Sequence, residues 1–372
     1  MANTNRAVAY IDLSILEENY KTIKSKVSPG TEVLCVVKAD AYGHGAVEVC
    51  RRLESLGVFY LGVATIDEAV KLRIHDIGAP ILVMSGIMPW DDVSVFLRYN
   101  VTPVVYELSG LMKLCSMATA FLTPLKIHLK FDTGMGRLGF MPDNASTIIN
   151  LLAGVDNIQI EGLMSHFACS ELRDEDGIRQ IDSFKKVIEY FSNNGIRPKI
   201  IHMANSGAII SYPEANFNMV RTGICLYGSH ASKELKDQLP TRQVMKFVSK
   251  IALIREFPAG YALSYGRTYI TKRKTRAAYI PVGYADGYPR ALSNKGSVLI
   301  HGKRCDIIGR VCMDWFLVDI TDNDHMQVND EAILLGESTG DCISADEIAE
   351  IAETIPYEIL CKISRRVTRT YE

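Results

Sequence analysis

Residues 32–39, which read EVLCVVKA, decide the fold, because the segment is apolar at every position from Val33 to Val37. A strand that faces solvent on one side alternates apolar and polar residues, so a continuous apolar run indicates a strand covered on both faces. Residues 81–84, ILVM, have the same character. Strands of this kind are typical of parallel sheets that carry helices on both sides.

Further runs of this type recur through the first 230 residues, spaced so that a helix fits between neighbours. Eight strands are predicted, at residues 32–39, 59–64, 80–85, 102–106, 124–131, 158–165, 199–203 and 218–222. Helical patterns lie between them at residues 67–75, 90–99, 178–194 and 207–211. Eight such units predict a TIM-type (β/α)₈ barrel. A doubly wound sheet is the alternative, and it is disfavoured because no G-x-G-x-x-G follows the first strand.

The pattern changes from about Val244 onward, where strand-like runs follow one another with only turns between them. These runs are residues 244–254, 276–281, 297–301, 305–308, 315–320 and 331–335. Turn sequences such as Ala285-Asp286-Gly287 separate them, which indicates a mostly antiparallel β-rich region. We therefore predict two domains, a barrel over residues 1–241 and a β-rich domain over residues 242–372.

Composition excludes several classes of protein. The chain has 372 residues with 41 Lys and Arg against 43 Asp and Glu, so its net charge of −2 gives no general attraction to nucleic acid. No run of about 18 apolar residues is present, so we expect no membrane span. Nine cysteines are scattered without a C-x-x-C pair, and Arg6 and Asp12 lie where a signal peptide would be apolar. We expect reduced thiols and a cytoplasmic enzyme.

The active site of such a barrel lies at the C-terminal ends of its strands. Lys38 ends the first predicted strand, where burial would lower the pKa of its amine and leave it able to form a Schiff base. Ser206 and Gly223 lie in the loops after the seventh and eighth strands. In barrels, these two loops commonly hold a phosphate. Taken alone, Lys38 better fits a surface lysine at a strand end, and Ser206 and Gly223 fit ordinary turns and helix caps equally well. Together, a lysine and an anion site favour pyridoxal 5′-phosphate.

A divalent metal is the alternative use of the polar strand ends. The candidate ligands are His44, His166, His202 and Asp132. None of them has the close spacing of an H-x-H or H-E-x-x-H site, so we predict no metal.

Several motifs in a fixed order resemble those of the bacterial alanine racemases. They are VVKADAYGHG (36–45), KFDTGMGRLG (130–139), SHFA (165–168), HMANS (202–206), VRTGICLYG (220–228), SYGRTY (264–269), VGYADGYPR (282–290) and GRVCMD (309–314). The resemblance covers nearly the whole chain. The sequence departs from the family pattern little, for example with Thr368 where proline is more usual and with a bulky Trp315.

The resemblance implies a role for each matching residue. Lys38 would bind pyridoxal phosphate covalently and act as one catalytic base, and Tyr265 from the partner subunit would act as the other. The cofactor phosphate would be bound by Tyr42, Ser206, Gly223, Ile224 and Tyr357. Arg221 would face the pyridine nitrogen, with His166 against the ring and linking Arg221 to Tyr265. Two bases on opposite faces of a planar carbanion are what racemisation requires.

The resemblance also implies how the substrate is held and used. Arg137 and the backbone of Met313 would orient the carboxylate of alanine, and Lys130 matches a lysine that is often carbamylated in relatives. We expect a homodimeric isomerase that interconverts L- and D-alanine and supplies D-alanine for cell-wall peptidoglycan. The alternatives are a serine racemase, an amino-acid decarboxylase on the same fold, or a non-catalytic pyridoxal-phosphate carrier. An arginine at position 221 argues against the decarboxylase, in which a carboxylate is usual.

Overall fold

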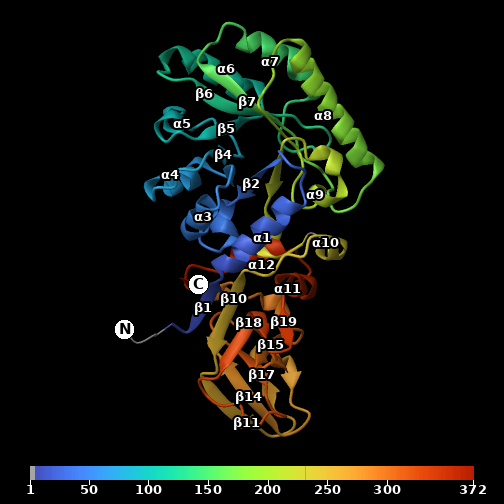
Figure 1. The fold of residues 1–372 in the computed structure, drawn as a ribbon. Coiled ribbons are helices and arrows are strands. Elements are labelled where there is room, and N and C mark those ends of the chain that lie inside the picture. The colour runs from blue at the N-terminus through green and yellow to red at the C-terminus, as the bar shows by residue number, and fades with distance from the viewer. Residues whose placement is uncertain (1–4, 231) are drawn as a thin grey trace.

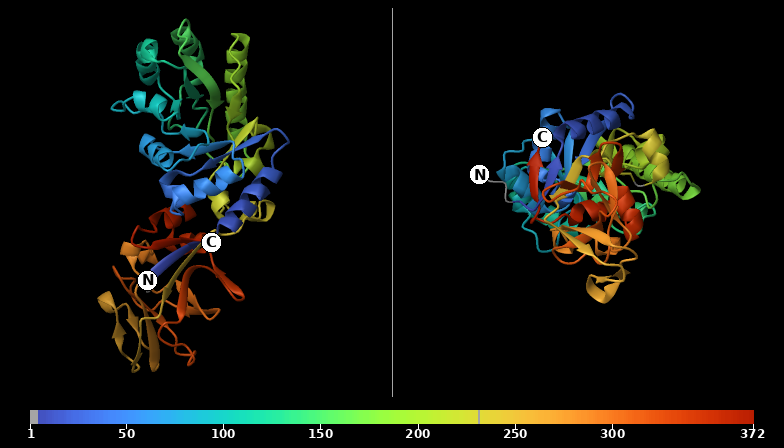
Figure 2. Two further views of the ribbon diagram at one scale, coloured as in Figure 1. Left: turned by 60° about the vertical axis from the view of Figure 1, so that its left-hand side comes forward. Right: turned by 90° about the horizontal axis from the view of Figure 1, so that it is seen from below.

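The computed structural model describes residues 5–230 and 232–372. The chain forms two parts, a ring of parallel strands surrounded by helices and an antiparallel β-sheet region below it (Figure 1). Helices α1 (Leu13–Ser25) and α12 (Pro356–Lys362) lie where the two parts meet in Figure 1, and Figure 2 shows the two parts from two further sides. None of the helices in the described part of the chain is long and apolar enough to cross a bilayer.

The upper part contains eight parallel strands in the order β8-β7-β6-β5-β4-β3-β2-β9. Their bounds are β2 Glu32–Val36, β3 Tyr60–Val63, β4 Ile81–Val83, β5 Thr102–Val105, β6 Leu125–Lys130, β7 Ile158–Met164, β8 Ile200–His202 and β9 Met219–Thr222. Each lies within a predicted strand. The two strands at the ends of this order, β8 and β9, lie next to each other. Here the backbone N–H of Arg221 in β9 donates to the carbonyl of Ala204, just after β8, at 2.9 Å. The predicted (β/α)₈ fold class is confirmed.

Helices cover this ring from outside, and their apolar faces explain why they dock there. In α8, Ile181, Phe184, Val187 and Phe191 recur at helical spacing and are all buried. The helices of the barrel part are α1 Leu13–Ser25, α2 Lys38–Tyr42, α3 Ala46–Ser55, α4 Ile66–Ile74, α5 Ser94–Arg98, α6 Leu108–Met117, α7 Ala145–Leu152, α8 Glu175–Asn193, α9 Ala208–Ser211 and α10 Lys233–Gln238. Two more, α11 Ala345–Ala352 and α12 Pro356–Lys362, belong to the β-rich part. The predicted helix over residues 90–99 is shorter than expected.

The β-rich part is built on a sheet in the order β16-β15-β18-β10-β1-β20, with β19 paired to β18. Its strands are β1 Ala7–Ile11, β10 Met245–Lys250, β15 Ser297–Ile300, β16 Lys303–Asp306, β18 Glu331–Ser338, β19 Asp341–Ile343 and β20 Thr368–Tyr371. The smaller sheets contain β11 Leu253–Phe257, β14 Thr275–Ile280 and β17 Phe316–Asp319, and the pair β12 Ala262–Leu263 with β13 Tyr269–Ile270. The mostly antiparallel character is confirmed.

Two features of this part differ from the predictions. The single strand predicted over residues 244–254 is two strands in different sheets, because the chain breaks at Ile251 and Ala252 between β10 and β11. Strand β1 comes from the start of the chain but pairs antiparallel with β10 and parallel with β20. Strands β1 and β20 therefore lie side by side in the β-rich sheet, although residues 7–11 belong to the stretch predicted for the barrel domain.

Candidate active site

A cavity of about 380 Å³ opens at the C-terminal ends of the barrel strands. It gathers ten of the twelve predicted site residues, namely Lys38, Tyr42, Lys130, Arg137, His166, Ser206, Arg221, Gly223, Ile224 and Tyr357. They come from loops and strand ends spread over the whole barrel, and Tyr357 comes from α12 of the β-rich part. Tyr265 and Met313 are not among the residues that line this cavity.

Lys38 directly follows β2, and the chain behind it has an unusual conformation. Ala39, Asp40, Ala41 and Tyr42 all have φ between 52° and 55°, in the left-handed region that residues with a Cβ rarely adopt. The backbone N–H of Ala39 donates to a carboxylate oxygen of Glu68 at 2.7 Å. The turn is thus held by a contact from α4, and it fixes where Lys38 enters the cavity.

Three cations share the cavity with Lys38, and they set the electrostatics of the site. Burial and the charge of Arg137 lower the pKa of the Lys38 amine. Burial, followed by the charges of Arg221 and Arg137, lowers the pKa of Lys130 to about 8. Both amines therefore have a larger neutral fraction than a surface lysine, and a neutral amine is the nucleophilic form.

One side of the cavity is suited to an anion. The backbone N–H of Gly223 donates to Ser206 Oγ at 2.9 Å, which leaves the Ser206 proton free for another acceptor. A Cβ at Gly223 would lie 2.7 Å from the Tyr42 hydroxyl, so glycine keeps this corner open. Burial raises the pKa of Tyr42 and of Tyr357, so both phenols remain protonated donors. Hydroxyl donors around a small open corner fit the phosphate group of pyridoxal phosphate.

Arg221 also lines the cavity and is only 3% exposed. It donates to His166 Nδ1 at 2.9 Å, to His202 Nδ1 at 3.0 Å, and to the carbonyls of Ser165 and Met203 at 2.8 Å each. Burial and the charge of Arg221 hold the pKa of His166 well below its usual value, so the ring is neutral. Because Nδ1 accepts, the single proton of His166 is on Nε2.

The proposed metal alternatives do not form one site. The carboxylate of Asp132 accepts from the backbone N–H groups of Gly134, Met135 and Arg137, so it stabilises its own loop. His44 contacts the carbonyl of Ala41 through Nδ1. In residues 5–230 and 232–372, no group of three His, Cys, Asp or Glu side chains is placed to hold a metal.

Tyr265 and Met313 lie together on loops of the β-rich part. The Tyr265 side chain is 75% exposed. Ser264 Oγ accepts from the N–H of Arg310 at 3.0 Å, and the N–H of Ala285 donates to the carbonyl of Met313 at 3.1 Å. Three loops are thus tied into one surface, which exposes the large side chains of Tyr265, Tyr284, Met313 and Trp315.

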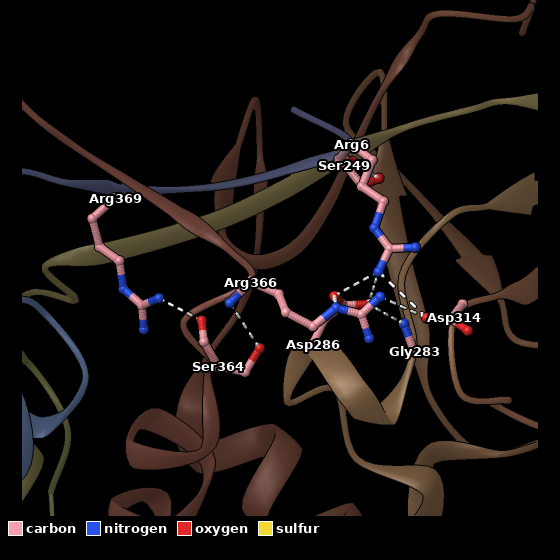
Figure 3. Close-up of polar contacts among 8 residues, drawn as sticks. All are labelled: Arg6, Ser249, Gly283, Asp286, Asp314, Ser364, Arg366 and Arg369. Carbon is pink, nitrogen blue, oxygen red and sulfur yellow. Dashed lines mark hydrogen bonds and ion pairs between the residues drawn. The ribbon is translucent and has the colours of Figure 1, made fainter. Parts of the chain in front are cut away.

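Sequence reasoning missed the ion-pair cluster that supports this surface (Figure 3). Asp286 is almost fully buried and accepts from Arg6 at 2.9 Å, while Arg366 contacts Asp286 at 3.5 Å and Asp314 at 2.7 Å. Asp314 directly follows Met313. The sequence Ala-Asp-Gly at 285–287 indicated only a turn, and no local pattern linked it to Arg6 or Arg366, which are far away along the chain.

Comparisons with known proteins agree over the full chain. A family model described as the N-terminal domain of alanine racemase matches residues 11–231, and one for the C-terminal domain matches residues 244–371. An alanine racemase from Halothermothrix orenii is 41% identical over 98% of this chain and 96% of that protein. Alanine racemase 2 from Caldanaerobacter subterraneus is 42% identical over 97% of this chain and 93% of that protein. The crystal structure of alanine racemase from Streptomyces lavendulae has a TM-score of 0.94 at 35% identity and covers 100% of this chain and 98% of that one.

Proposed function

This chain belongs to the alanine racemase family, whose members are isomerases that use pyridoxal phosphate, and we propose how its own residues divide the interconversion of L- and D-alanine. The observation that carries the proposal is the cavity that places Lys38, a hydroxyl-lined corner and the buried Arg221 around one space. When bound, pyridoxal phosphate supplies an aldehyde that reacts with amines and a ring that withdraws electrons from the substrate Cα.

Lys38 and Tyr265 act as the two bases in this proposal. Lys38 holds the cofactor, and its Nζ moves the proton on one face of the substrate Cα. The hydroxyl of Tyr265 from the partner subunit moves the proton on the other face. A tyrosine accepts a proton only as its phenolate, so it needs a hydrogen-bond donor that stabilises this form. The Nε2–H of His166, fixed by Arg221, supports that role.

The remaining residues bind and orient. Tyr42, Ser206, Gly223, Ile224 and Tyr357 hold the phosphate, and Arg221 faces the ring nitrogen. A guanidinium gives up a proton less readily than a carboxylic acid, so Arg221 leaves this nitrogen unprotonated and limits electron withdrawal. That restraint favours return of the proton to Cα over side reactions.

Arg137 and the backbone of Met313 orient the substrate carboxylate. Lys130 is proposed to be carbamylated, because a carbamate would place a negative charge among Lys38, Arg137 and Arg221, the cations that now lower its pKa. The resulting carboxylate would orient Arg137.

A homodimer with shared sites completes the proposal. Tyr265 is exposed and outside the cavity of its own chain, and Met313 lies beside it on the same surface. A base in that position is useful only if the surface docks onto the cavity of a second copy. We place the division between the two domains near residue 241, apart from β1.

We also propose that this enzyme works in the cytoplasm and that its D-alanine is used for peptidoglycan. All nine cysteines are free, which fits a reducing compartment. The comparisons do not favour a serine racemase, a decarboxylase or a non-catalytic carrier, since every relative described above is an alanine racemase over nearly its full length.

Complementation between two inactive variants tests the shared site. Lys38→Ala and Tyr265→Phe chains are expressed together with different tags, and the mixed dimer is purified through both tags. One of its two sites then has an intact Lys38 and an intact Tyr265, so we expect about half of the wild-type activity. A mixed dimer of Lys38→Ala with the double variant is the control and stays inactive. If the bases come from the same chain, both mixed dimers are inactive, and the proposal is wrong.

A further inference from the structure

A chain of buried polar side chains runs from Arg221 into the interior of the barrel. His202 Nδ1 accepts from Arg221 at 3.0 Å, and His202 Nε2 lies 2.9 Å from Nδ1 of His128. Nε2 of His128 lies 3.5 Å from a carboxylate oxygen of Glu161, a charge contact that is too long for a hydrogen bond and leaves Nε2 without another partner among the described residues. We refer to His202, His128 and Glu161 as the histidine chain. Both histidines are 0% exposed, so no bulk water competes for these contacts.

Donor and acceptor rules fix the proton on each ring. An arginine only donates, so His202 Nδ1 has no proton and its Nε2 carries one. That proton is donated to Nδ1 of His128, which therefore has its own proton on Nε2, the atom that faces Glu161. Burial lowers the pKa of both histidines, so each ring is neutral with one proton. In the histidine chain, the ring proton of His202 and the ring proton of His128 thus both point away from Arg221.

Glu161 is the negative end of this chain. It accepts from the Tyr60 hydroxyl at 2.8 Å and pairs with Lys126 at 2.9 Å. Burial raises the pKa of Glu161, but its contacts with His128, Lys126 and Tyr60 outweigh burial and lower the pKa to about 2. Glu161 is therefore charged, and Lys126, whose side chain is 52% exposed, is the only one of these partners at the surface.

Arg221 has no carboxylate of its own within the described ranges. Its side-chain partners are the neutral rings of His166 and His202 and two backbone carbonyls. A buried guanidinium without a counter-charge is costly, and polarised hydrogen bonds in series transmit a compensating charge. Two hydrogen bonds connect Arg221 to His202 and His128, and the carboxylate of Glu161 faces the far end of this series at 3.5 Å.

We propose that Glu161 is a positioning residue for Arg221, acting through His128 and His202 as the negative end of a directional chain that fixes the guanidinium in the cavity. The inference rests on the proposed placement of Arg221 beside the cofactor ring. Arg221 sets the proton arrangement of the two rings, and if Glu161 merely filled the barrel interior, removal of its charge would leave the resonances of both histidines unchanged. The arrangement of these protons is therefore the property to measure.

The experiment combines nitrogen-15 NMR of histidine-labelled full-length protein, with and without cofactor, and steady-state kinetics of the holoenzyme. For the wild type we expect both rings to be neutral with the proton on Nε2. Glu161→Gln keeps the shape and removes the charge, so the His202 resonances should move together with those of His128. The kcat should fall about tenfold, as for other supporting hydrogen bonds around a reactive group, with little change in KM. Lys126→Gln is the matched control and should change neither.

Two results would overturn the inference. One is a proton on Nδ1 of His202 or His128 in the wild type, a measurement that needs no variant to fold. The other is a Glu161→Gln enzyme whose His202 resonances and kcat equal those of the wild type. The NMR measurement without cofactor is independent of the complementation between Lys38 and Tyr265, so failure of either proposal is recognised separately.

Discussion

The hydroxyl of Ser206 and the backbone N–H of Gly223 are joined by a hydrogen bond of 2.9 Å that links the loops after β8 and β9. Because Ser206 accepts here, its own proton remains available to an anion in the cavity. The two residues are 17 positions apart in sequence, yet they form a single corner together with the Tyr42 hydroxyl.

Replacing Gly223 with alanine should weaken cofactor binding. The new methyl group would lie 2.7 Å from the Tyr42 hydroxyl and must displace it from the phosphate corner. The φ of Gly223 is −125°, so a positive φ does not call for glycine here, and the close approach to Tyr42 is the reason for the expected effect. We expect the Kd for pyridoxal phosphate, measured by fluorescence titration, to rise about tenfold, or about 1.4 kcal/mol. Gly110→Ala, with only ordinary contacts to Glu107, is the control. An unchanged Kd would refute the assignment.

Lys130 should take up carbon dioxide in a pH-dependent way. Carbamylation needs the neutral amine, and a pKa of about 8 means that this form increases as pH rises. At constant dissolved CO₂, uptake at pH 8 should be about fivefold faster than at pH 7. Carbon-13 NMR with labelled CO₂ follows the carbamate, and Lys130→Arg serves as the control without a site. Equal rates at both pH values, or a signal that persists in Lys130→Arg, would contradict this prediction.

Tyr265→Phe should separate the two faces of the substrate. L- and D-alanine have equal free energies, so the loss of one base slows net racemisation equally in both directions. Exchange of the α-hydrogen for deuterium in D₂O can differ between the two enantiomers, because removal and return of the proton on one face need only one base. We expect racemisation to fall at least about 10²-fold, while the enantiomer whose α-hydrogen faces Lys38 still exchanges it and the other enantiomer does not. Proton NMR of each enantiomer measures both rates.

The control for this prediction is Tyr261→Phe, a change at another exposed tyrosine of the β-rich part. It should leave both rates unchanged. Equal retention of exchange for both enantiomers in Tyr265→Phe would mean that a different group serves as the second base.

Acid should destabilise the protein below about pH 6.5. Burial lowers the pKa of His44 to about 4, and it also lowers the pKa of His128, His166 and His202. Unfolded histidines bind protons near pH 6.5, so the unfolded chain takes up more protons as pH falls. The stabilisation is complete above about pH 6.5. Below about pH 6.5, each buried histidine lowers the free energy of unfolding by up to about 1.4 kcal/mol per pH unit.

Denaturant unfolding between pH 7.5 and 5.5, at fixed protein concentration, measures this slope. His44→Gln should make the dependence of the free energy of unfolding on pH less steep, by the equivalent of up to one bound proton. His75→Gln changes an exposed histidine and should leave this dependence as it is. A free energy of unfolding that does not change over this pH range would contradict the prediction.

The barrel could be predicted because each of its strands is a local apolar pattern. Runs such as residues 32–39 and 81–84 are decided by neighbours along the chain, and Lys38 follows from its place at a strand end. The break at Ile251 and Ala252 could not be predicted, because the same apolar run continues while the chain moves from one sheet to another.

The supports of the site were also out of reach of sequence patterns. Glu68 reads as an ordinary surface residue of α4, and its contact with the Ala39 N–H appears only when α4 packs beside the turn. Asp286 is similar, since its arginine partners are 280 residues before it and 80 residues after it. Such contacts between distant segments depend on the finished fold, and the family resemblance supplied site residues but not these supports.

The left-handed turn behind Lys38 bears on when the protein becomes reactive during its synthesis. Each of its residues has a Cβ, and holding such a residue in this conformation costs about 1–2 kcal/mol. A free peptide would not maintain it, so the turn requires the completed ring and the Glu68 carboxylate. On a nascent chain, Lys38 is then an ordinary flexible amine with no special affinity for aldehydes. Capture of the vitamin B6 derivative thus marks the end of folding.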